Sequence, residues 1–355
     1  MIVRHTLGRG LVGTHHLQIP RATTTVVRVK GRPLHRARTA TGNGEIKGES
    51  SYLVPEYEWK GCKVRYSASG VEGAEPILLI HGFGASFRHY RKLIPELSKR
   101  YKVYAIDLLG FGSSDKPLLD YKMEIWEEQI GHFLGQVLCP GQQVHLVGNS
   151  IGSLASLMVS SSYPEKVKSV TLLNCAGGLN NKAVADDWRI RIAMPVFLLI
   201  DFLLKQPSIA RYLFDTVRKK ENLRNILLPI YPSNPAAVDE ELIEILHRPS
   251  VDSNAIDVFV STITGPPGPK PMDLVDKVKC PILVVWGEKD SLTPIDGPVG
   301  RYFKGLPSLR KGSLSRFVTL PRVGHCPMDE APEQVMEALI PFLEDVVSND
   351  DSNAE

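Results

Sequence analysis

The sequence predicts an α/β fold in which helices cover both faces of a mostly parallel central sheet. Two observations lead to this prediction: short apolar runs alternate with segments of helical period, and most of these runs are apolar at every position. A strand buried between two layers of helices requires such a continuous run, because both of its faces are covered. The chain has 355 residues, of which 43% are hydrophobic and 23% charged, the ordinary balance of a globular protein. No run reaches the roughly 18 apolar residues that a membrane span needs.

The first segment, residues 1–48, is not expected to belong to this fold. Its first 44 residues contain eight Arg or Lys and no Asp or Glu, and they include the threonine run Thr23–Thr25. A basic, hydroxylated and acid-free composition is typical of an organelle transit peptide. The alternative is a basic arm that contacts nucleic acid or anionic lipid. Because the formal net charge of the chain is only +3, nothing requires a nucleic-acid partner and we expect none.

The core is expected over residues 49–177 and 271–347. Its strands are predicted at Glu56–Trp59, Lys63–Ser67, Pro76–Ile80, Val103–Ile106, His145–Val147, Val170–Leu173, Ile282–Trp286 and Phe317–Leu320. Its helices are predicted at Phe87–Arg100, Lys122–Val137, Ile151–Ser162 and Pro332–Val346. This regular succession of strand and helix favours parallel neighbours in one sheet.

The alternation of strand and helix stops between residues 178 and 270. This segment has helical patches and no convincing strand, and it ends at the stiff Gly/Pro-rich stretch Gly265–Pro269. An insertion of this kind between two core strands predicts a helical lid over the carboxyl edge of the sheet. After the last helix, the acidic residues 348–355 are expected to form a disordered tail.

A candidate nucleophile lies in Gly148–Gly152, which follows a predicted strand and opens a helix. A sharp strand-to-helix turn lifts Ser150 above the sheet, and the two glycines, Gly148 and Gly152, remove side chains that would clash there. The same turn places Ser150 at a helix N-terminus, where backbone N–H groups favour a developing negative charge. The pattern predicts a nucleophile elbow.

An oxyanion hole is predicted beside this serine. His81–Gly84 ends an earlier buried strand, and its glycines allow the backbone to turn back toward the nucleophile. We expect the backbone N–H groups of Phe83 and Ile151 to stabilise the oxyanion. The alternative for His81–Gly84 is an ordinary turn from strand to loop.

The serine needs a base, and the base needs a carboxylate to orient it. Asp290 follows the strand that begins at Ile282, and His325 follows the strand that begins at Phe317. Both therefore belong to the carboxyl edge of the sheet, where sites assemble in open parallel sheets. We expect Ser150, His325 and Asp290 to form a triad, with Glu288 as the less favoured alternative acid.

The five cysteines are widely spaced and show no CxxC or Cys/His ligand pattern, so we expect no zinc site and no other metal. They are expected to be reduced thiols. Cys326 adjoins His325, but the triad already uses that histidine, and a catalytic role for the thiol is not expected. This chemistry needs no organic cofactor.

These motifs, in register from about Tyr52 to Val347, resemble the α/β-hydrolase family. Asp107–Asp115 and Asp290–Pro294 also match that family. Relatives with an aspartate nucleophile, the epoxide hydrolases and dehalogenases, are disfavoured because position 150 is a serine. The family implies a carboxylic-ester hydrolase that acts through an acyl-enzyme.

Within that family the chain is most similar to the plant and algal chloroplast hydrolases that remove phytol from chlorophyll pigments, the chlorophyll dephytylases, with pheophytinases more distant. The matching segments are Asn149–Ser153, Leu173–Gly178, Asp187–Arg191, Ile200–Gln206, Thr264–Pro269 and Asp296–Gly300. This resemblance implies a chloroplast enzyme associated peripherally with the thylakoid membrane. Its substrate would be chlorophyll or a related phytylated pigment, its products chlorophyllide and phytol, and residues 1–48 a chloroplast transit peptide. The alternatives are a lipase or general carboxylesterase, and a hydrolase-fold receptor for a small lactone.

One run in the lid, Ile192–Leu204, is apolar nearly all round and is interrupted by Pro195 and Asp201. It is too short to span a bilayer. It is either a helix buried against the core or an apolar surface that receives a long-chain substrate or meets a membrane. In the second interpretation, the side chains expected to bind substrate are Met194, Phe197, Leu199 and Phe202.

Overall fold

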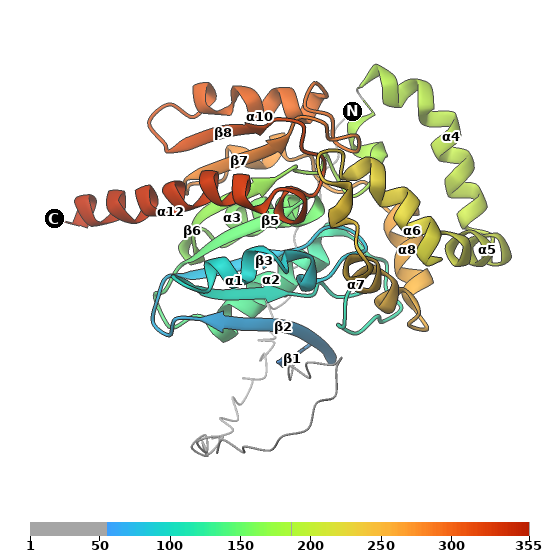
Figure 1. Ribbon diagram of the computed structural model, residues 1–355, viewed down its shortest axis with the longest axis horizontal. Helices are drawn as coiled ribbons and strands as arrows, with labels where there is room; N and C mark the ends of the chain where they lie inside the picture. Colours follow the sequence, from blue (N-terminus) through green and yellow to red (C-terminus); the bar gives the residue numbers. More distant parts are fainter. Residues whose placement is uncertain (1–54, 186, 355) are drawn as a thin grey trace, which may run out of the picture. The chain divides into compact units, whose positions relative to one another are not determined.

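The computed structural model describes residues 55–185 and 187–354, so the expected transit peptide, residues 1–48, lies outside the described residues. The centre of the fold is an eight-stranded sheet in the order β1-β2-β4-β3-β5-β6-β7-β8 (Figure 1). Its strands are β1 Glu56–Trp59, β2 Cys62–Gly70, β3 Pro76–Ile80, β4 Lys102–Ile106, β5 Val144–Asn149, β6 Val167–Leu173, β7 Ile282–Gly287 and β8 Ser315–Leu320. The first two strands are antiparallel to their neighbours, and the other six run parallel.

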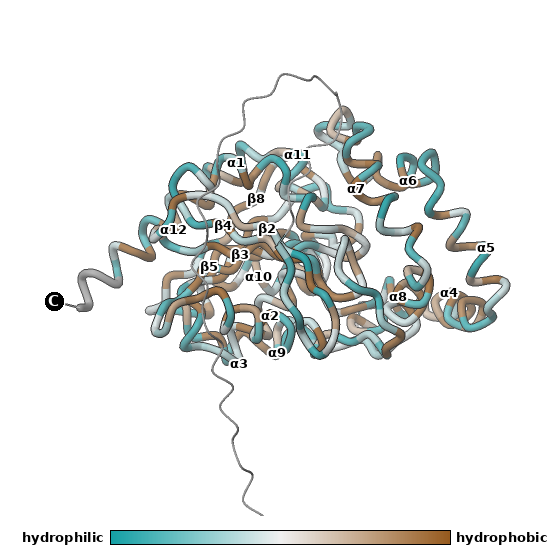
Figure 2. The backbone as a smooth tube through the Cα atoms, turned by 90° about the horizontal axis from the view of Figure 1, so that it is seen from below, coloured by the Kyte–Doolittle hydropathy of each residue, from teal (hydrophilic) through white to brown (hydrophobic). Residues whose placement is uncertain are grey.

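The sheet is buried on both faces, as the continuous apolar runs predict. Every residue of β3 is buried, and its side chains alternate between two hydrophobic clusters: Leu78 and Ile80 join one, Ile77 and Leu79 the other. This alternation follows from the pleat, which points successive side chains to opposite faces. Figure 2 shows these strands as hydrophobic segments inside the molecule.

Helices supply the other half of each cluster. The first cluster includes residues of α2 (Met123–Val137), α3 (Ile151–Ser162), α9 (Met272–Val275) and α10 (Pro298–Leu309). The second includes residues of α1 (Leu93–Leu97), α11 (Pro327–Glu330) and α12 (Pro332–Ala354). The predicted fold class, a mostly parallel sheet with helices on both faces and a helical insertion, is confirmed.

The insertion between β6 and β7 contains helices, and within its described residues it contains no strand. These helices are α4 Trp188–Leu204, α5 Pro207–Val217, α6 Lys220–Leu227, α7 Glu240–Ser250 and α8 Ala255–Thr264. Short 3-10 turns complete it at Asn181–Val184, Leu228–Ile230 and Pro235–Ala237. Side chains of α6, α7 and α8 enter the two core clusters, so the lid is anchored to the core through its second half.

The structure differs from the predicted elements in several places. The segment Phe87–Arg100 forms a 3-10 turn at Phe87–Tyr90 and the short helix α1, because Pro95 lacks the N–H that a continuous helix would need. Helices α9, α10 and α11 were not predicted. A disordered tail was expected at residues 348–355, but helix α12 continues to Ala354. Its buried apolar side nucleates the helix, and each further residue then adds a hydrogen bond at little extra cost.

Candidate active site

Ser150 occupies a strained turn between β5 and α3. Its backbone has φ 56° and ψ −118°, a conformation that non-glycine residues seldom adopt. The neighbouring glycines make the turn possible. A Cβ at Gly148 would lie 2.3 Å from the carbonyl oxygen of Gly152, and a Cβ at Gly152 would lie 2.2 Å from the carbonyl oxygen of Ile80. Ser150 therefore occupies a strained strand-to-helix turn of the kind that the sequence predicts, and its role as the nucleophile stays a prediction.

His325 and Asp290 form a buried pair at the same edge of the sheet. The His325 Nδ1 atom lies 2.8 Å from Asp290 Oδ2, and both residues are almost completely buried. This contact makes Nδ1 the N–H donor, so Nε2 is free to accept a proton. Glu288, the alternative acid, instead accepts a hydrogen bond from the backbone N–H of Arg322 and is exposed.

Further donors hold the Asp290 carboxylate in its charged form. The backbone N–H groups of Leu292 and Thr293 donate to Oδ1 at 2.8 and 3.0 Å, and the Thr293 hydroxyl donates to Oδ2. Burial alone would raise the pKa of Asp290, but the charge and hydrogen bond of His325, together with Thr293, hold that pKa below its ordinary value. Asp290 is therefore suited to stabilise an imidazolium on His325.

Asn174 is a positioning residue that we did not identify from the sequence. It is fully buried, with φ 47°. Its amide Nδ2 donates to Asp290 Oδ2 at 2.6 Å, and its Oδ1 accepts from the backbone N–H of Gly287 at 3.1 Å. The positive φ aims the side chain at the acid. Asparagine is among the residues that tolerate this conformation, but the sequence alone does not reveal which asparagine adopts it.

The serine and the histidine are linked through Asn149. The amide Nδ2 of this residue, adjacent to Ser150, donates to the carbonyl oxygen of His325 at 3.0 Å. Ser150 Oγ makes no hydrogen bond within residues 55–185 and 187–354, so the contact between the hydroxyl and His325 Nε2 stays a prediction. Such contacts are often long without substrate and tighten when it binds.

The loop after β3 is held in one orientation by His81. Its Nε2 accepts from the backbone N–H of Leu108 at 3.0 Å, and its Nδ1 therefore donates to the carbonyl oxygen of Gly82 at 2.7 Å. In a planar trans peptide the N–H of Phe83 points opposite to that carbonyl, so His81 also fixes the direction of this N–H. Burial lowers the pKa of His81 to about 4, which keeps the ring neutral.

Both backbone groups assigned to the oxyanion hole are available as donors. In the described part of the chain, neither the N–H of Phe83 nor that of Ile151 donates to another protein atom. Ile151 is the first residue of α3, where helical N–H groups have no partner within the helix. The oxyanion hole itself stays a prediction.

The thiol of Cys326 is unsuited to nucleophilic attack. It is buried, and burial together with the charge of Asp290 raises the pKa of Cys326 well above its ordinary value. A thiolate is the reactive form of cysteine. All five cysteines are free, and no group of three or more His, Cys, Asp or Glu among the described residues could hold a metal ion.

A small aromatic cavity adjoins the predicted oxyanion loop. It has a volume of about 70 Å³ and is lined by Phe83, Phe111, Phe214 and Phe259 among others. The rings form a chain of contacts from the core to the lid. The ring centroid of Phe83 lies 5.6 Å from that of Phe111 and 6.0 Å from that of Phe259. The ring centroid of Phe259 lies 5.2 Å from that of Phe214. Sequence reasoning missed Phe214 and Phe259, because single aromatic residues in a helical segment give no sign of the cavity they line.

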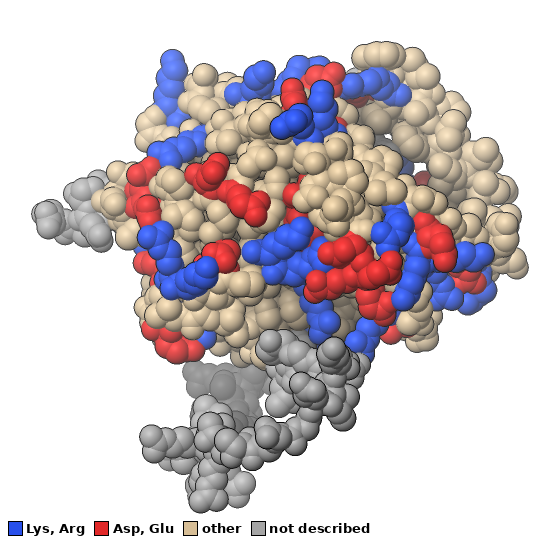
Figure 3. Space-filling model, viewed as in Figure 1, with Lys and Arg blue, Asp and Glu red and all other residues tan. Residues whose placement is uncertain are grey.

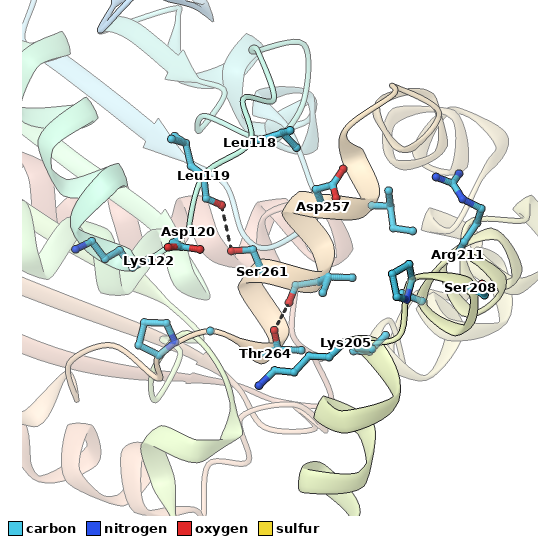
Figure 4. Close-up of a pocket in the computed structure, with 17 residues that line it drawn as sticks. Leu118, Leu119, Asp120, Lys122, Lys205, Ser208, Arg211, Asp257, Ser261 and Thr264 are labelled. Atoms are coloured by element: carbon cyan, nitrogen blue, oxygen red, sulfur yellow. Dashed lines mark hydrogen bonds between the residues drawn. The ribbon is translucent and has the colours of Figure 1, made fainter.

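A larger groove of about 1300 Å³ lies on the other side of α8. Figure 4 shows it between the loop of Leu118 and Leu119, the α8 side chains Ser261 and Thr264, and the start of α5. None of the triad residues lines this groove or the aromatic cavity, but the aromatic cavity includes Phe83 of the predicted oxyanion loop and the groove does not. Helix α8 therefore separates the groove from the aromatic cavity.

The four lid residues expected to bind substrate do not gather in one place. Met194 and Phe197 are half-buried, whereas Leu199 and Phe202 are exposed, and none of the four lines either cavity. The interpretation of this run as a helix buried against the core is wrong, since only Leu204 of α4 is buried. Whether the four residues bind substrate stays a prediction.

Comparison with known proteins gives the family. The model of the "Alpha/beta hydrolase family" matches residues 77–338. The chain is 25% identical to a chloroplastic pheophytinase of Arabidopsis thaliana, over 82% of this chain and 66% of that protein, slightly less than two thirds of its length. It is 26% identical to Lipase 1 of Psychrobacter immobilis, over 78% of this chain and 79% of the lipase.

Solved structures agree with this assignment. A serine hydrolase involved in carbazole degradation is 25% identical and superposes with a TM-score of 0.63, over 83% of this chain and 99% of that one. A bacterial membrane phospholipase A, also 25% identical, has a TM-score of 0.62 over 82% of this chain and 86% of that chain. With its parallel sheet, its serine elbow and this match, the chain belongs to the alpha/beta hydrolase family and is a hydrolase.

Proposed function

We propose that this protein is a serine ester hydrolase of the chloroplast that removes phytol from chlorophyll or a related phytylated pigment. The observation that carries the proposal is the buried His325–Asp290 pair, 2.8 Å apart, at the same sheet edge as Ser150 on its strained elbow. The likeness to a chloroplastic pheophytinase and the basic, acid-free first 44 residues support the pigment and the compartment. Peripheral association with the thylakoid membrane is part of the proposal.

The reaction follows from these positions. Ser150 Oγ attacks the ester carbonyl while His325 Nε2 takes its proton, and the backbone N–H groups of Phe83 and Ile151 stabilise the oxyanion. His325 then gives the proton to the leaving alcohol, phytol, which leaves the pigment carboxylate attached to Ser150. Water, activated by His325, hydrolyses this acyl-enzyme to chlorophyllide. Asp290 stabilises the imidazolium in both steps.

A substrate of this size requires the lid to move. The aromatic cavity beside Phe83, at about 70 Å³, is far too small for an isoprenoid chain or a pigment ring. On its lid side Phe214 of α5 contacts Phe259 of α8. Separation of these two rings would enlarge the cavity, which is lined by Phe83 of the predicted oxyanion loop.

The proposal is tested by incubating purified protein with chlorophyll and separating the products by chromatography. The wild type should release chlorophyllide and phytol, and Ser150→Ala should lose activity by several orders of magnitude with an unchanged thermal midpoint. Hydrolysis of short esters by the wild type without release of phytol would favour the second candidate, a lipase or general carboxylesterase. The likeness to Lipase 1 favours that candidate.

A further inference from the structure

Helix α4 exposes a continuous apolar stripe. Trp188, Ile192, Val196, Leu199 and Phe202 are spaced by three or four positions, which places them on one face of the helix. Their exposed fractions are 69, 71, 57, 56 and 62%. Large apolar side chains are exposed singly on most proteins, but a contiguous stripe marks a surface that binds something.

The opposite face of α4 packs toward the protein. It carries the half-buried Met194 and Phe197 and the buried Leu204. Asp201, the only acidic residue of the helix, lies on this inner face and forms an ion pair with Lys182 at 2.8 Å. The orientation of α4 is therefore determined by its own contacts, and its one negative charge is neutralised on the side away from the stripe.

Exposed cations lie on α4 and at its end. Arg191 lies in the first turn of α4, three positions after Trp188. Lys205, which directly follows α4, and Arg211 of α5 line the groove beside α8 (Figure 4). Within the part of the chain that the structure describes, none of them forms an ion pair. Figure 3 shows few charged side chains over α4 on the face in view.

Exposed aromatic residues of the interfacial type occur on both α4 and α5. Trp188 begins α4, and Tyr212 of α5 is 71% exposed. Trp and Tyr are enriched where membranes meet water, because one part of each ring system is apolar and another can hydrogen-bond. No described helix is long and apolar enough to cross a bilayer by itself, and α4 and α5 meet at an angle of 106°.

We propose that α4 docks on a lipid bilayer, with its stripe in the boundary between headgroups and acyl chains. Arg191, in the first turn of α4, would then contact anionic headgroups, an attraction worth about tenfold or less in affinity. The proposal rests on the proposed function for its setting, because a phytylated pigment dissolves in a membrane. Its evidence is the surface of α4 itself. A second copy of the chain is the alternative occupant, and the experiment below tests it.

The experiment uses the full chain and vesicles of phosphatidylcholine, with and without phosphatidylglycerol. Trp188 is a built-in reporter: the other tryptophans, Trp59, Trp126 and Trp286, are at most 5% exposed. Its fluorescence should shift to the blue on vesicles that contain phosphatidylglycerol, less so at high salt, and the shift should be absent in Trp188→Phe.

Leu199→Asp places a carboxylate in the centre of the stripe. It should weaken vesicle binding at least about tenfold, since a charge is strongly disfavoured in an apolar layer. Its thermal midpoint should not change, because the side chain is exposed. Phe202→Asp gives a second variant with the same expected result. Leu309→Asp is the matched control: this leucine, at the end of α10, is 63% exposed, and its substitution should leave binding unchanged.

Two results would overturn the proposal. In the first, the protein binds vesicles but the fluorescence of Trp188 does not shift, or Leu199→Asp binds vesicles as tightly as the wild type. Either outcome would assign the binding to the basic first 44 residues. In the second, the wild type is a dimer in sedimentation and Leu199→Asp is a monomer, so the stripe belongs to a second copy. The activity on soluble esters is unaffected by either result, so the proposed hydrolase chemistry is tested separately.

Discussion

Replacing Asn174 by glycine should lower kcat without raising KM. The side-chain amide of Asn174 donates to Asp290 Oδ2 at 2.6 Å, and Asn174 lines neither cavity. Loss of this amide should therefore make the Asp290 carboxylate less well oriented rather than weaken substrate binding. Glycine is the suitable replacement because residue 174 has φ 47°, which glycine adopts without strain.

The size of the effect follows from the hydrogen bonds that remain. A hydrogen bond to a charged group contributes about 1.5–3 kcal/mol, equivalent to about 10- to 150-fold in rate. Asp290 keeps His325 and Thr293 as donors, so we expect a loss of kcat of about tenfold, near the lower end. Asn174→Ala should lose as much activity, and should also lose roughly 1 kcal/mol or more of stability, because alanine is strained at this φ.

The assay is steady-state hydrolysis of a short, soluble ester, with the thermal midpoint measured on the same samples. Asn222→Ala is the matched control, since its amide donates to the carbonyl oxygen of Thr216 at 2.7 Å within the lid, and its kcat should be that of the wild type. An unchanged kcat in both Asn174 variants would refute the positioning role. The positioning role would also be refuted if the loss of kcat in the two variants followed their thermal midpoints instead of being equal for glycine and alanine.

Three further predictions concern stability, the cavity and the leader. Burial lowers the pKa of His81 and His89 to about 4. As the pH falls, these two histidines are protonated in the unfolded chain before they are protonated in the folded protein, which destabilises the fold. Burial raises the pKa of Asp107 to about 6, so this carboxyl is protonated first in the folded protein, which stabilises the fold as the pH falls. The protein should therefore lose about 2 kcal/mol of unfolding free energy from about pH 7 to about pH 5, and His89→Gln clearly less, as urea titrations at both pH values can measure. Phe214→Ala enlarges the cavity and should raise kcat/KM for bulky esters roughly fivefold relative to short ones; an equal effect on both would exclude a role of this ring in size selection. A fusion of residues 1–48 to a fluorescent protein should be imported into plastids and shortened, whereas full-length fusion protein in the cytosol would favour the basic-arm interpretation.

The sheet, and the site residues at the ends of its strands, could be predicted from the sequence. A strand buried on both faces must be apolar throughout, and β3 and β7 show this directly. Strand ends in a parallel sheet meet at one edge, so the chain positions of Asp290 and His325 relative to their strands were enough to predict the contact between them. The contact between Ser150 and His325 stays a prediction.

Features that depend on tertiary contacts could not be predicted. Asn174 acts through a positive φ and a contact 116 positions away in the chain, and no local pattern encodes either. Helix α4 is apolar on nearly every side, so its sequence could not show which side faces the protein; the Lys182–Asp201 pair decides this. The helical continuation of α12 depends on the buried turns that precede it.

The central claim is that Ser150 is the nucleophile activated by His325, and labelling with a fluorophosphonate tests it most directly. This reagent phosphonylates serines that are activated by a neighbouring base. Mass spectrometry should find a single adduct on Ser150 in the wild type, and none in Ser150→Ala or His325→Ala. An unlabelled Ser150 in protein that hydrolyses a soluble ester, or an adduct on Cys326 or another residue instead, would contradict the account.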